Sequence, residues 1–162
     1  YEMHNCLVGS EMRIRDRFTH PLPNDLRRIA EQTSGILLNW YLTDWTNTTN
    51  KINYAIDKVE QTDGISKVTI ERIGLMPMPL EVLVKYKDGS EEFYYIPISL
   101  MRGEKKQPTY AKNWRQIKDW SWAYKKYTFE VNSKLESIKS IDLNPTGLIA
   151  DTDNSNDIII FE

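Results

Sequence analysis

Apolar residues recur at helical intervals through the first third of the chain. From Glu2 to about Phe18 they are Met3, Leu7, Val8, Met12 and Ile14, which leaves Arg13, Arg15, Asp16 and Arg17 for the solvent side. This spacing predicts a helix over about residues 2–18, ended by the prolines of the His20-Pro21-Leu22-Pro23 turn.

Two further short helices are expected before residue 48. Asn24 stands where an N-cap is favoured, and Gly35 suits the C′ position that ends a helix. The stripe of Leu, Tyr and Trp residues from Leu37 to Thr46 predicts the third helix.

After Thr48-Thr49-Asn50 the apolar period changes from about 3.6 to 2, as in Ile52, Tyr54 and Ile56. The clearest local signal is Asp88-Gly89 between the alternating runs 79–87 and 90–97. It predicts a tight β-hairpin with a primed turn, because that turn needs positive φ.

Strand patterns resume at 127–131 and 138–143, and residues 158–161 form either a last strand or a tail. Residues 101–121 read as a long connection pinned to the core by tryptophans. Six or seven antiparallel strands predict a β-sandwich, since a single sheet would leave one apolar face in water. The expected class is α+β, with a helical segment over residues 1–48 and a β domain over residues 49–162.

Composition narrows the choice of partners. The 162 residues carry 21 basic and 23 acidic side chains, a formal charge of -2, which gives no electrostatic footprint for nucleic acid. No run of apolar residues approaches the length of a transmembrane segment. The single cysteine, Cys6, cannot form an intrachain disulfide and is expected to be a small buried apolar group.

The sequence contains no recognisable catalytic constellation. Its two histidines, His4 and His20, have no H-E-x-x-H motif or nearby cysteine partner, so a protein-built zinc site is not expected. Motifs of nucleophile elbows, P-loops and dinucleotide-binding turns are absent as well. No catalytic residue, metal ligand or cofactor is therefore assigned to these residues.

Two groups of residues invite a binding interpretation. The polar run 151–157 holds calcium-type oxygen ligands but lacks the Gly and Glu that complete an EF-hand loop, so a solvated turn is the simpler interpretation. The tryptophans form either interdomain packing or a ligand platform; they are Trp40, Trp45, Trp114, Trp120 and Trp122.

The order of several motifs resembles the C-terminal region of aminopeptidase N-like zinc metallopeptidases of the gluzincin type, in their Bacteroidetes form. The resemblance starts at Asn24-Asp25-Leu26 and runs through Ser34-Gly35 and Leu38-Asn39-Trp40-Tyr41 to Trp45, then continues through 85–97, 101–104 and 141–156. Leu148 departs from it, since many members have Arg there.

The resemblance implies that residues 1–48 are the helical end of a catalytic region and that residues 49–162 form the C-terminal β domain. Family members hold zinc with an H-E-x-x-H helix and a distant Glu, and none of these maps onto the present residues. The chain would thus be a non-catalytic part of a peptidase, with zinc and peptide substrates belonging to the parent. Members of this bacterial type are usually exported, so the resemblance implies a periplasmic or cell-envelope location for the parent protein.

Two other interpretations stay open. The β domain would act alone as a peptide- or glycan-binding module if its tryptophans formed a platform. Self-association through the helical segment would produce a homodimer and is compatible with either function.

Overall fold

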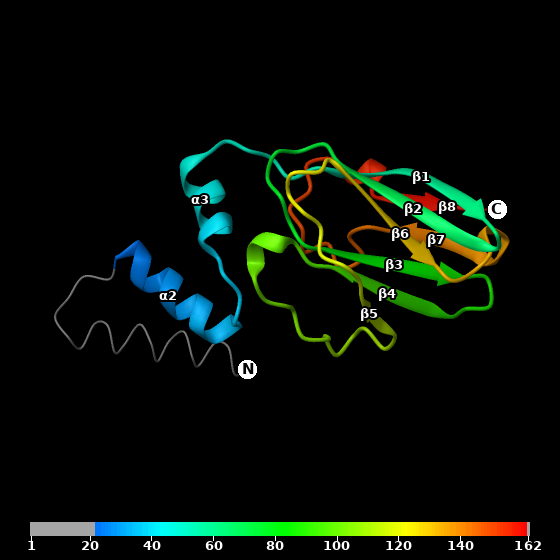
Figure 1. Cartoon of the computed structure of the whole chain (residues 1–162), viewed down its shortest axis with the longest axis horizontal. Helices are drawn as coiled ribbons and strands as arrows, with labels where there is room; N and C mark the ends of the chain where they lie inside the picture. Colours follow the sequence, from blue (N-terminus) through cyan, green and yellow to red (C-terminus); the bar gives the residue numbers. More distant parts are fainter. Residues whose placement is uncertain (1–21, 162) are drawn as a thin grey trace.

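The computed structural model describes residues 22–161, and it places two helices at one end of two β-sheets (Figure 1). The helices are α2 (Pro23–Ser34) and α3 (Asn39–Asn47). They match two of the three expected helices, and the helix expected over about residues 2–18 lies outside the described residues. The class is α+β.

Helix α2 begins two residues earlier than expected. Leu22, not Asn24, is the N-cap, and its N–H donates to the Asp25 carboxylate at 3.0 Å. Pro23 takes the first helical position, where its fixed φ fits and its missing N–H costs nothing. The expected end is confirmed, because Gly35 has φ 71° and its N–H donates to the Glu31 carbonyl at 2.9 Å.

The eight strands form two sheets with antiparallel pairing throughout, except between β4 and β5. The three-stranded sheet has the order β1-β2-β6 and the five-stranded sheet β5-β4-β3-β7-β8. The strands are β1 (Tyr54–Thr62), β2 (Ile65–Arg72), β3 (Leu80–Tyr86), β4 (Glu91–Ile96), β5 (Trp114–Gln116), β6 (Lys126–Val131), β7 (Ile138–Asp142) and β8 (Ile158–Ile160).

The hairpin at Asp88-Gly89 is confirmed, but its turn type is not the primed one. Only Gly89 has positive φ, at 86°, and its N–H donates to the Tyr86 carbonyl at 3.1 Å. This is a three-residue connection with glycine in the left-handed position. The two-residue primed geometry occurs instead between β1 and β2, where Asp63 and Gly64 have φ 52° and 81°.

The inner faces of both sheets contribute to one hydrophobic cluster. Val82 and Ile96 of the five-stranded sheet and Val68 of the three-stranded sheet are fully buried in it. Tyr94 of β4 meets Phe129 of β6 with ring centroids 5.2 Å apart, so the contact crosses from one sheet to the other. Alternate residues of β6 are buried, whereas β3 is buried on both faces over residues 80–84, because its outer face is covered as well.

The connection before β5 covers the outer face of the five-stranded sheet. The nearly buried Glu81 carboxylate accepts hydrogen bonds from the Lys105 ammonium and from the Tyr110 hydroxyl. Ala111 packs on Leu83 and Phe93 in a second small cluster. The long connection is thus pinned to the sheet, although its anchors include this polar contact as well as the expected tryptophans.

The turn between α2 and α3 joins the helices to the β-sheets at one corner. Leu37 donates its N–H to the Met101 carbonyl at 2.8 Å, and Ile36 packs against the main core. A Cβ added to Gly103 would lie 2.5 Å from the Gly35 carbonyl oxygen. Only glycine permits this close backbone approach.

We predict that Gly103→Ala destabilises the chain by about 1–3 kcal/mol, or roughly 3–10 °C in Tm. Gly103 is not among the residues with positive φ, so the cost would come from the contact with Gly35 and not from its own backbone. Circular dichroism melting measures it. Thr109→Ala, in the same connection and exposed, is the control, and equal Tm values for the two variants would contradict this packing.

Candidate functional site

The helices present apolar side chains that the rest of the described chain does not cover. Neither α2 nor α3 contains a buried residue. Four exposed residues are together called the helical surface. With their exposed fractions, they are Leu22 (63%), Leu26 (53%), Leu37 (42%) and Trp45 (51%). An uncovered group of this kind marks a site of interaction with another surface.

Two aromatic residues of α3 hold the same segment in place. Trp40 and Tyr41 pack partly buried against the main core, and the Trp40 indole N–H donates to the Leu37 carbonyl at 2.7 Å. Tyr41 contacts both tryptophans of α3 edge to face, with centroids 5.7 Å from Trp40 and 6.0 Å from Trp45. The anchored rings therefore hold Trp45 in its exposed position.

The five candidate tryptophans do not form a single exposed platform. Trp114 stacks on Tyr95 at 5.1 Å beside the five-stranded sheet. Trp120 is 4% exposed and stacks on Tyr127, at the opposite extreme from Trp122, which is 55% exposed. Trp120 is thus a core residue, whereas Trp45 and Trp122 are available for contact with a partner.

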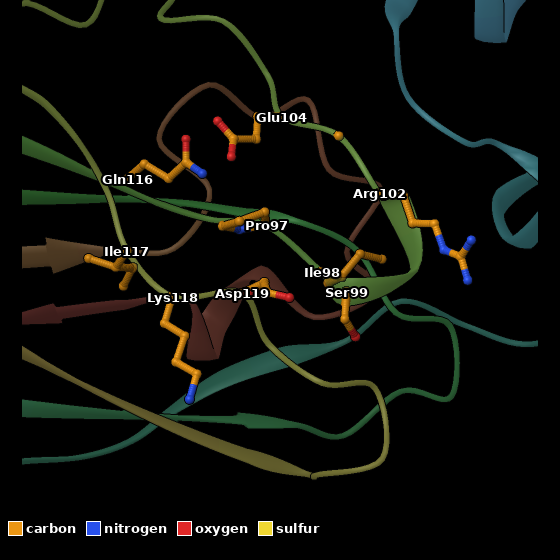
Figure 2. Close-up of a pocket in the computed structure, with 10 residues that line it drawn as sticks. Pro97, Ile98, Ser99, Arg102, Glu104, Gln116, Ile117, Lys118 and Asp119 are labelled. Carbon is orange, nitrogen blue, oxygen red and sulfur yellow. The ribbon is translucent and has the colours of Figure 1, made fainter.

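A cleft of about 330 Å³ lies between the 3-10 turn η1 (Ser99–Met101), with the residues after it, and the segment 116–119. Its charged lining residues are Arg102, Glu104, Lys118 and Asp119. Figure 2 shows Glu104 and Gln116 on one side, with Lys118 and Arg102 directed away from them. The charged groups do not converge on one point, so the cleft offers no acid–base pair for catalysis.

No pattern in the sequence predicts this cleft. Arg102 adopts the left-handed conformation, with φ 46° and ψ 36°, which is uncommon for a residue with a side chain. This conformation turns the chain from η1 toward Gly103 and the α2–α3 turn. Helical or strand periodicity does not report such a corner.

The shifted tyrosine pKa values have structural causes. Burial raises the pKa of Tyr54 to about 12 and that of Tyr127 to about 12. The Tyr54 hydroxyl accepts from the Met78 N–H at 2.7 Å and lies 3.2 Å from the Met78 carbonyl oxygen. These hydroxyls stay protonated near neutral pH and serve as hydrogen-bonding groups.

The described residues contain no group of three or more His, Cys, Asp or Glu side chains placed to hold a metal ion. His4, His20 and Cys6 lie outside the described residues. No helix in residues 22–161 is long and apolar enough to cross a membrane.

We predict that substitutions at two neighbouring tryptophans have very different effects on stability. Trp120→Ala removes a buried ring and the hydrogen bond from its indole N–H to the Tyr124 carbonyl, so it should cost about 3–5 kcal/mol. Trp122→Ala should change stability by less than about 0.5 kcal/mol, because the ring is exposed. Urea unfolding measures both, and similar values would contradict the placement.

Comparisons of this chain with models of known protein families, with curated proteins and with solved structures found no match.

Proposed function

We propose that this chain is the non-catalytic C-terminal region of a zinc-dependent aminopeptidase and that its helical surface packs against the catalytic domain of the parent protein. One observation carries the proposal: α2 and α3 have no buried residue, and the segment exposes Leu26 and Trp45 on these helices as well as Leu22 and Leu37 at their ends. Such helices fit the edge of a larger helical domain. The motif order between Asn24 and Trp45 supports the choice of family.

The roles proposed for the two parts of the chain follow from the contacts between the helices and the sheets. Residues 1–48 would belong to the catalytic region, and residues 49–162 would form a β-sandwich that braces it. The shared core and the Tyr94–Phe129 contact support the sandwich arrangement. Gly103 against Gly35 and the hydrogen bond from Leu37 to Met101 would transmit this support to the helices.

The gene provides the first test. The reading frame that encodes Tyr1 should contain an H-E-x-x-H motif within a few hundred upstream codons, followed by a more distant Glu. The parent should bind one zinc ion and hydrolyse amino-acid p-nitroanilides, whereas the 162 residues alone should do neither. A parent without that motif, or stoichiometric zinc with turnover in the 162 residues alone, would overturn the proposal.

We predict that Leu26→Glu destabilises the parent but leaves the isolated chain nearly unchanged. The side chain is 53% exposed here, so the charge should cost little until another domain covers it. Differential scanning calorimetry of both proteins, with and without the substitution, measures the difference. We expect a loss of several degrees in the parent only.

Leu148→Glu is the matched control, because Leu148 is 76% exposed and lies away from the helical segment, after β7. It should be neutral in both proteins. Equal effects of the two substitutions in the parent would contradict docking through the helical surface. Light scattering of the isolated chain separates this result from self-association, which Leu26→Glu would also weaken.

A peptide- or glycan-binding module remains the second candidate function. Trp122 and Tyr124 favour it, because the two rings are 55% and 69% exposed in the connection before β6. The informative variant is Trp122→Ala, since Trp120→Ala would damage the core. Quenching of tryptophan fluorescence by a peptide or oligosaccharide library, lost in Trp122→Ala, would support the module.

A further inference from the structure

A second cavity, of about 280 Å³, lies where β7 ends and the chain turns toward β8. Most of its lining residues carry side-chain oxygen atoms; the lining consists of Asp142, Asn144, Gly147, Ile149, Asn154, Asp157 and Ile158. Histidine and cysteine are absent from this lining. The cavity is separate from the helical surface and from the cleft at Arg102.

Asp157 is the unusual member of this lining. The residue is only 5% exposed, and its carboxylate has no hydrogen-bond partner among the described residues. Its backbone is fixed, because the Leu143 N–H donates to the Asp157 carbonyl at 2.9 Å. A buried carboxylate without a partner is costly, so this position calls for a proton or a cation.

The electrostatic surroundings of Asp157 are negative. Burial, together with the nearby carboxylates of Asp151, Asp142 and Asp153, raises the pKa of Asp157 to about 6. Within residues 22–161, none of these four carboxylates takes part in an ion pair with Lys or Arg. The protein thus gathers negative charge here without balancing it.

Three of the four carboxylates accept hydrogen bonds within the fold, and one of these is Asp142, which accepts the Asn144 N–H at 3.0 Å. Asp151 accepts the Tyr54 N–H at 2.9 Å and the Asp153 N–H at 2.9 Å. Asp153 accepts both the N–H and the hydroxyl of Ser155. The contacts of Asp151 and Asp153 shape the turns of the 151–157 run. Of the four carboxylates, Asp142 and Asp157 are the two that line the cavity.

We propose that this cavity binds a calcium ion between the carboxylates of Asp142 and Asp157. Ligands made only of oxygen favour hard cations, and Ca²⁺ accepts irregular sets of carboxylate, amide and water oxygens. Asn154 supplies an amide oxygen at the cavity wall. With only two carboxylates, the site belongs with weak calcium sites, whose dissociation constants are about 0.1–1 mM.

The site differs from the one that the sequence suggests. Residues 151–157 look like a continuous loop of ligands, but Asp151 and Asp153 do not line the cavity. Asp142 enters from β7, which the run does not include. This inference does not depend on the proposed aminopeptidase function, and either one can fail without the other.

Thermal unfolding of the chelator-treated chain at pH 7.5 tests the site. Addition of 10 mM CaCl₂ should raise Tm by about 3–5 °C, and isothermal titration should give one site per chain. Asp157→Asn should abolish this increment, while raising the Tm without calcium because it removes a buried negative charge. A second variant, Asp142→Asn, should weaken the calcium affinity measured by titration at least tenfold.

Asp63→Asn is the control, because Asp63 lies in the exposed β1–β2 turn, where Asn also accepts positive φ. It should keep the full calcium response. An unchanged Tm of the unsubstituted chain at 10 mM CaCl₂ would overturn the proposal and leave a proton as the partner of Asp157. A full response in Asp157→Asn would overturn it too, since the ion would then bind elsewhere.

Discussion

The shared apolar core between the two sheets is the interaction on which the rest of the structure depends. The inward-facing apolar residues of β2 and β6 meet those of β3 and β4, and neither face is stable in water alone. The Tyr94–Phe129 contact lies across this interface. Every other feature of the chain is attached to this core from outside.

The helices illustrate this dependence. They have no core of their own, and they hold their position through the α2–α3 turn, where Ile36, Trp40 and Tyr41 pack on the β core. The contact of Gly103 with Gly35 brings the two backbones together at the same corner. A segment that is anchored to the β core and also exposes apolar residues can connect that core to another domain, which is why we propose that it packs against the rest of a larger enzyme.

The sequence predicts what local periodicity controls. The end of α2 at Gly35, the hairpin of β3 and β4 and the change of period near residue 50 all follow from residues close together in the chain. The same signal was available for β1 and β2, because Asp63-Gly64 has the same composition as Asp88-Gly89 and takes the primed turn that was expected at the latter. Strand length and pairing register decide between the two turn types.

Long-range contacts set the features that the sequence does not predict. The three-residue strand β5 exists because it pairs in parallel with β4, which no local pattern indicates. Trp120 and Trp122 look alike in the sequence, yet the core accepts only the first. The environment of Asp157 is likewise set by the fold, since the nearby Asp142 carboxylate comes from β7.

Hydrogen–deuterium exchange of α2 and α3 tests the central claim most directly, with the isolated chain compared with the full parent protein. The account predicts fast exchange of the helix amides in the isolated chain and strong protection in the parent, because a catalytic domain would cover the helical surface there. Equal protection in the two proteins would contradict the claim that this surface packs against another domain.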